Sequence, residues 1–211
     1  LFDYHTVGDL DLFAVQGSAL RPVEDSGGPA ISRLFRNDTA GPGRRPRFTD
    51  VTVHSGLALS ANGMGAAAGD FDNDGWVDIY VTALGANHLL RNNGDGTFSD
   101  VTARSRTADD RWSTSATFVD YDRDGWLDLF VVNYVQFSPR LERACFSSGS
   151  ARDYCNPAVY QPEGDRLLRN NRDGTFSDVT ARAGLAAATG RGLGVLALDG
   201  DQEGWVGLYG P

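Results

Sequence analysis

One twelve-residue string occurs twice in this chain, with its two copies 50 residues apart. It reads DFDNDGWVDIYV at 70–81 and DYDRDGWLDLFV at 120–131. A second string, RNNGDGTFSDVTA at 91–103, returns as RNNRDGTFSDVTA at 169–181. Weaker copies of the first string lie at 3–14 and 199–210. A unit that recurs at a fixed spacing indicates a repeat architecture, in which one supersecondary structure is copied along the chain.

Each unit predicts four short antiparallel strands, which is the pattern of a β-propeller blade. In one copy the strands are expected at 63–69, 76–83, 88–92 and 97–103. The next copy should place its strands at 115–119, 126–133, 166–170 and 175–181, and a further first strand is expected at 192–198. Gly- and Asn-rich hairpin turns separate the third and fourth strands. No stretch shows a helical apolar stripe, so we expect an all-β fold.

The spacing divides the chain, taken as a single β-propeller portion over 1–211, into successive blades. The blades are expected at 3–53 (without its first strand), 63–103, 113–181 and, in part, 192–211. The third blade carries an insertion of 28 residues at roughly 134–162. Joining the two ends would close only three blades, which are too few for a propeller ring. Because the chain also starts at Leu1 rather than Met, we expect it to be an incomplete portion of a larger propeller.

The loop between the first two strands carries carboxylates at positions 1, 3, 5 and 9. In the first complete copy they are Asp70, Asp72, Asp74 and Asp78, and Trp76 offers a backbone carbonyl at position 7. The second copy places the same ligand types at Asp120, Asp122, Asp124, Trp126 and Asp128. This alternation suits a hard cation with oxygen ligands, and Ca²⁺ more than Mg²⁺. A solvated hairpin is the alternative, but four carboxylates this close repel one another unless they are neutralised.

The outer copies of the loop are less complete. Asp199, Asp201 and Glu203 retain three acids while Gly207 stands at position 9, so a weaker metal site is expected there. In the first copy His5 and Val7 replace two acids and leave Asp3 and Asp11, and no metal is expected. Arg91 and Arg169 recur at one position of the third strand, which predicts a structural pairing with neighbouring carboxylates or carbonyls.

The strings LLRNNGDGTFSDVTA and GDFDNDGWVDIYV resemble the FG-GAP/VCBS repeats of integrin-α-type β-propellers. The branch most similar to this chain includes cartilage acidic protein and its bacterial relatives. The resemblance extends over nearly the whole chain and implies propeller blades. It also implies that calcium is bound by the loops at 70–78 and 120–128.

Both cysteines, Cys145 and Cys155, lie in the insertion. A disulfide closing so short a loop would stabilise the fold by about 3 kcal/mol in the chain-entropy model. Two free thiols or part of a metal site are the alternatives, although the lack of a nearby His makes a poor zinc set. The form Cys…Tyr-Cys-x-Pro resembles the bacterial branch of the family and favours the disulfide. A disulfide predicts an extracellular, periplasmic or cell-surface location.

Charge and motifs restrict the function. The net charge of −9 argues against a nucleic-acid partner, and no apolar run is long enough to span a membrane. The three histidines (His5, His54 and His88) belong to no catalytic motif, so an enzyme is not favoured. We expect a calcium-stabilised binding or scaffold module with a protein or glycan partner, either on its own or as a subunit of a larger assembly. A lectin-type propeller, or a propeller enzyme of lyase or hydrolase type, are the alternatives.

Overall fold

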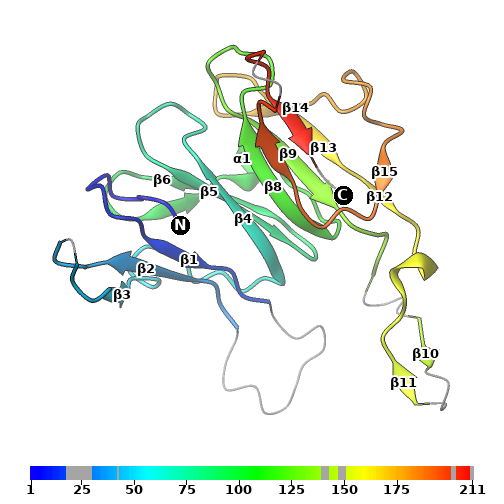
Figure 1. The fold of residues 1–211 in the computed structure, drawn as a ribbon, viewed down its shortest axis with the longest axis horizontal. Coiled ribbons are helices and arrows are strands. Elements are labelled where there is room, and N and C mark those ends of the chain that lie inside the picture. Colours follow the sequence, from blue (N-terminus) through cyan, green and yellow to red (C-terminus); the bar gives the residue numbers. More distant parts are fainter. Residues whose placement is uncertain (18–29, 42, 139–142, 147–150, 201–202, 210–211) are drawn as a thin grey trace.

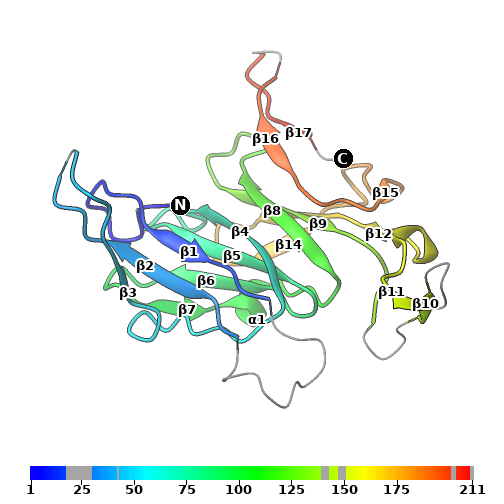
Figure 2. The ribbon, with the colours of Figure 1, turned by 60° about the horizontal axis from the view of Figure 1, so that its bottom comes forward.

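A computed structural model describes residues 1–17, 30–41, 43–138, 143–146, 151–200 and 203–209. In this part of the chain the fold is nearly all-β, and antiparallel sheets follow one another in chain order (Figures 1 and 2). The described sheets do not close into a ring. The predicted all-β class, with sheets consistent with propeller blades, is confirmed.

Two four-stranded sheets form the centre of the molecule. The first has the order β4–β5–β6–β7, with strands Gly63–Gly69, Asp78–Ala83, His88–Asn92 and Phe98–Asp100. The second has the order β8–β9–β13–β14, with strands Ser113–Val119, Asp128–Asn133, Arg166–Asn170 and Phe176–Asp178. Their first two strands pair in equivalent registers, which end at Gly69 opposite Asp78 and at Val119 opposite Asp128. The two acidic loops therefore lie at equivalent corners of the two sheets.

Smaller sheets flank the central pair. On one side lies the order β1–β2–β3, with strands Leu12–Ala14, Arg33–Asn37 and Phe48–Asp50. On the other side β16 (Leu196–Leu198) pairs with β17 (Gly207–Tyr209). The strand expected at 192–198 is therefore shorter in the structure, since it begins at Leu196.

Apolar side chains from neighbouring sheets form the core between them. One cluster joins Tyr4 and Leu34 of the first sheet region to Ile79, Val81 and Leu90. The next joins the two central sheets, with all members buried: Phe71, Tyr80, Leu89, Leu129, Val131, Leu168 and Phe176. Strands β5 and β9 are buried along their whole lengths, and their alternate apolar side chains pack into different clusters on the two faces of each sheet.

Strand β4 lies against β8 and allows a close approach because it is built of small residues. A Cβ atom added at Gly65 would lie 2.9 Å from the carbonyl oxygen of Thr114, and one at Gly69 would lie 2.9 Å from the ring of Phe118. Larger side chains at these two positions would force the sheets apart.

The fourth strand is shorter than the expected 97–103, because the chain turns after Asp100. The Asp100 carboxylate accepts hydrogen bonds from the backbone N–H (3.0 Å) and the hydroxyl (2.5 Å) of Thr102. A single helical turn, α1 (Thr102–Ser105), follows and ends at Arg106, which adopts φ 63°. Local side-chain bonding of this kind competes with continued strand pairing.

The insertion extends away from the sheets (Figure 1). It contains the hairpin β10–β11 (Cys145–Phe146 and Arg152–Asp153) and the 3-10 turn η2 (Pro157–Val159). Strand β12 (Glu163–Gly164) then pairs with β15 (Thr189–Gly190). Cys145 and Cys155 form the predicted disulfide, with their Cα atoms 5.1 Å apart. The insertion packs on Trp112, whose ring meets those of Tyr134 and Phe137 edge to face.

Candidate metal sites in the acidic loops

The first aspartate of each central loop shapes the turn. The carboxylate of Asp70 accepts hydrogen bonds from the backbone N–H groups of Asp74 (3.1 Å) and Gly75 (2.8 Å). Asp120 accepts the equivalent pair at 3.0 and 2.9 Å. Gly75 has φ 90°, a left-handed conformation that glycine adopts without a steric penalty. The D-x-D-x-D-G pattern is therefore folded by its own first carboxylate.

The last aspartate of each loop is fully buried at the start of the second strand. The two carboxylate oxygens of Asp78 accept hydrogen bonds from the backbone N–H groups of Phe71 (3.1 Å) and Asn92 (2.8 Å). Asp128 accepts the equivalent bonds from Tyr121 (3.3 Å) and Asn170 (2.8 Å). The carboxylate at position 9 is thus held by one backbone N–H from its own loop and one from the end of the third strand.

Three of the four predicted carboxylates in each loop come together. One oxygen each from Asp70, Asp72 and Asp78 lies within 4.8 Å of the others, and Asp120, Asp122 and Asp128 form the equivalent group. Oδ1 of Asp72 and Oδ1 of Asp122 are buried and have no hydrogen-bond partner in the described part of the chain. A buried acceptor without a partner is costly unless a ligand completes it.

The aspartates at position 5 do not join these groups. Oδ1 of Asp74 accepts the backbone N–H of Trp76 (2.9 Å), and its Oδ2 contacts Arg91. Asp124 likewise accepts the N–H of Trp126 and pairs with arginines. The carbonyls of Trp76 and Trp126 remain predicted ligands.

The buried aspartate at position 9 of each group is costly to ionise, although an arginine contacts the aspartate at position 3. Burial raises the pKa of Asp78 to about 7, against the opposing hydrogen bonds from the backbone, and the charges of Asp72 and Asp74 add to the rise. Burial similarly raises the pKa of Asp128 to about 6, with a further contribution from Asp122. A divalent cation would neutralise these groups, and an all-oxygen donor set fits calcium.

The two outer loops differ from the central pair. Asp3, His5 and Asp11 also bring one ligand atom each within 4.8 Å, although the sequence predicted no metal there. His5 Nδ1 lies 3.0 Å from Oδ2 of the buried Asp11, so these side chains are paired by a hydrogen bond.

In the last loop the backbone N–H of Gly204 donates to Asp199 at 2.8 Å, as in the central loops. Asp201 lies outside the described residues, and Glu203 is exposed. The weaker site predicted in this loop therefore stays a prediction.

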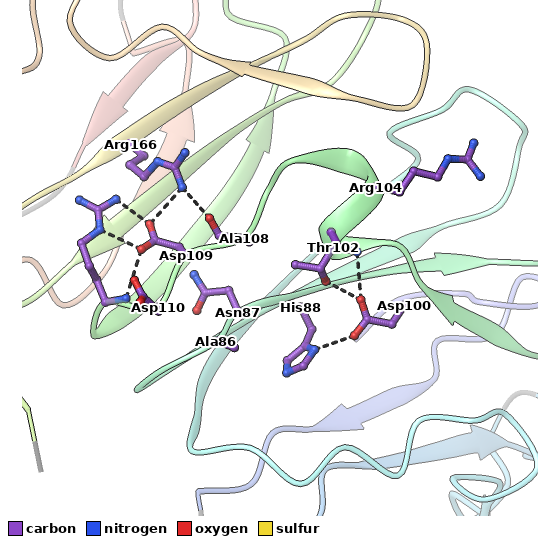
Figure 3. Close-up of a pocket in the computed structure, with 12 residues that line it drawn as sticks. Ala86, Asn87, His88, Asp100, Thr102, Arg104, Ala108, Asp109, Asp110 and Arg166 are labelled. Atoms are coloured by element: carbon purple, nitrogen blue, oxygen red, sulfur yellow. Dashed lines mark hydrogen bonds and ion pairs between the residues drawn. The ribbon is translucent and has the colours of Figure 1, made fainter.

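A separate hollow of about 860 Å³ is lined by residues of both central sheets (Figure 3). Five of its side chains form two groups of contacts: His88 Nδ1 lies 2.7 Å from Asp100, and Asp109 lies 2.6 Å from Arg111 and 3.4 Å from Arg166. The wall of the hollow is thus held by ion pairs. The pattern of the sequence had not pointed to it, because its lining residues come from two successive units and lie together only in the folded chain.

Sequence reasoning also missed Asn170, the residue that ties the two sites together. Its side-chain amide donates to the carbonyl of Leu127 in its own loop (2.9 Å) and to that of Phe71 in the preceding loop (2.8 Å). Asn92 makes the equivalent bonds to Val77 and Tyr4. The recurrence of Arg-Asn-Asn was visible in the sequence, but the partners lie 99 and 88 residues away.

Successive antiparallel sheets with equivalent acidic loops define a repeat protein built as a propeller-like binding module. The family model for the FG-GAP-like repeat matches residues 8–81 and again 70–131, which together cover more than half of the chain. The chain therefore belongs to the FG-GAP-like repeat family. No curated protein matches it. No helix within the described residues is long and apolar enough to cross a membrane.

Proposed function

We propose that this chain is a calcium-stabilised, extracytoplasmic binding or scaffold module, and that the loops 70–78 and 120–128 each hold one calcium ion. The observation that carries the proposal is a buried oxygen on Asp72 and one on Asp122 that have no hydrogen-bond partner among the described residues, each beside two further carboxylates. Calcium would neutralise charge and link the loop to the strands that follow it. The disulfide supports an oxidising location, where calcium is also abundant.

Within the family, we place the chain with the integrin-α-type propellers and the bacterial relatives of cartilage acidic protein. The support is the repeated motif LLRNNGDGTFSDVTA together with the loop GDFDNDGWVDIYV. The partner in this proposal is a protein or a glycan, and the chain acts as a subunit of a larger assembly. Both fit a module in which the repeated strings form the scaffold.

Thermal unfolding with and without calcium tests the proposal. Extracellular modules bind calcium with Kd on the order of 10⁻⁴–10⁻³ M, so millimolar calcium should stabilise the folded state by roughly 0.4–1.4 kcal/mol per site. Chelation should lower the melting temperature, and added calcium should restore it. Asp72→Ala and Asp122→Ala should each remove part of this response.

Asp3→Ala is the matched control, because Asp3 occupies position 1 of a loop that lacks the acids at positions 3 and 5. Its calcium response should equal that of the wild type. The calcium proposal fails if chelator leaves the wild-type melting curve unchanged and calorimetry detects no calcium binding at millimolar concentration.

A further inference from the structure

Two arginines on the third strands reach back to the acidic loops. Arg91 Nε lies 2.5 Å from Oδ2 of Asp72, and its Nη2 contacts Oδ2 of Asp74. In the next sheet Arg169 Nε lies 2.8 Å from Oδ2 of Asp122, and its Nη2 lies 3.3 Å from Oδ2 of Asp124. Each guanidinium therefore spans the carboxylates at positions 3 and 5 of its own loop.

The two oxygens of the position-3 aspartate have different surroundings. Oδ2 of Asp72 is held by Arg91, whereas Oδ1 is buried and has no hydrogen-bond partner among the described residues. Asp122 shows the same division, with Oδ2 on Arg169 and Oδ1 without a partner in the same part of the chain. When one oxygen of a carboxylate is held in place, the direction in which the other oxygen points is fixed as well. Outer partners of this kind fix the orientation of metal ligands.

The first copy of the repeat provides an internal comparison. Arg36 stands at the strand position of Arg91, but its loop has His5 and Val7 in place of the two acids. Arg36 Nε instead donates to Asp38 at 2.8 Å, and the other two copies have Asn at the place of Asp38. Within the described residues, the arginine thus contacts the loop only in the two copies whose loop carries aspartates at positions 3 and 5.

We propose that Arg91 and Arg169 are positioning residues for the two cation sites. Each holds Oδ2 of the position-3 and position-5 aspartates, so that the free Oδ1 at position 3 is presented to the cation. This inference rests on the proposed function. The positive charge of the arginine by itself disfavours a nearby cation. A contribution through orientation and one through charge therefore have opposite effects on calcium affinity.

Calorimetric titration of the whole chain with calcium chloride separates the two effects. The double variant Arg91→Lys/Arg169→Lys keeps both charges but loses the planar fork that contacts two carboxylates. It should bind calcium about 10-fold more weakly or worse, which is the size of outer-shell effects on metal affinity. Arg91→Gln/Arg169→Gln should weaken binding as well, although it removes the positive charges. Arg36→Lys is the matched control and should leave the affinity unchanged.

The outcomes are distinguishable. A wild type that binds no calcium refutes the proposed function. A wild type that binds calcium, with a Lys variant of equal affinity or a Gln variant of higher affinity, overturns the positioning role. Far-UV circular dichroism and melting in chelator check that each variant is folded. If the double variant unfolds, the single Arg91→Lys variant gives the same test, with the unchanged loop 120–128 as the reference site.

Discussion

Replacing Asn170 by alanine should destabilise the protein more than a typical substitution in a turn. The side chain is 1% exposed and makes three hydrogen bonds, all with backbone groups. It donates to the carbonyls of Phe71 and Leu127, and it accepts the N–H of Arg172 at 2.9 Å. At about 1 kcal/mol for each bond, Asn170→Ala should cost about 3 kcal/mol, and more if the buried carbonyl of Phe71 stays unpaired.

Urea and thermal unfolding would measure this cost. For a chain of this size, about 3 kcal/mol corresponds to a melting temperature roughly 6–12 °C lower. The measurement should be made in calcium and in chelator, because the Asn170 side chain bonds to carbonyls and not to the carboxylates. The loss should therefore be similar in both conditions.

Asn37 is the matched control, since it occupies the same position in the first copy of the repeat. Its amide donates to the carbonyl of Leu10 within its own loop at 3.1 Å, and its Oδ1 accepts the N–H of Thr39 at 3.0 Å. At about 1 kcal/mol for each of these two bonds, Asn37→Ala should cost about 2 kcal/mol. The reasoning is refuted if Asn170→Ala costs no more than Asn37→Ala, because the bond to the preceding loop would then contribute nothing.

Three further predictions concern pH and redox state. Burial alone would raise the pKa of Asp109, but its hydrogen bond with Arg111 and the charge of that residue outweigh burial and lower it below 3.8. Asp109→Asn should therefore lower the free energy of unfolding by about 2–3 kcal/mol near neutral pH. Urea unfolding should show this difference from the wild type shrinking below about pH 4, because protonation of Asp109 then removes the ion pair from the wild type as well. Calcium binding to both loops at pH 6 should release between one and two protons, because Asp78 with a pKa of about 7 is mostly protonated and Asp128 with a pKa of about 6 is about half protonated. Titration in buffers of different ionisation enthalpy would detect this release, and equal heats in all buffers would contradict the raised pKa values. Intact mass after alkylation without reductant should show both cysteines unmodified, and two alkylated thiols would disprove the bridge.

The features repeated in the sequence were the ones that it predicted well. Strand β4 and the third strands β6 and β13 have the predicted bounds, because Gly, Ala and Leu runs between turn residues allow few alternatives. Aspartates at positions 1, 3 and 9 were singled out by their spacing, and the structure brings them together. The disulfide followed from a family motif.

What the sequence could not predict depends on contacts between units. Position 5 was expected to be a ligand, yet Asp74 faces Arg91, a residue 17 positions away that spacing alone does not orient. The convergence of Asp3, His5 and Asp11 was missed because the loop was judged by its residue types, whereas its backbone keeps the same turn, with the N–H of Gly8 donating to Asp3. The chain turns after β7 through the hydrogen bonds of Asp100 with Thr102, and such local bonds leave no periodic pattern in the sequence.

The small residues of β4 also determine a geometric property of the whole array. Gly65, Ala67 and Gly69 let the edge of one sheet approach the next, while rings such as Phe71 and Phe176 separate the same sheets elsewhere. Two neighbouring sheets that lie closer together at one edge than at the other form a wedge. The angle of that wedge, and so the curvature of a stack of such units, depends on the difference in side-chain volume between the two edges. Enlarging Gly65 would reduce this difference, so it should narrow the angle and flatten the stack.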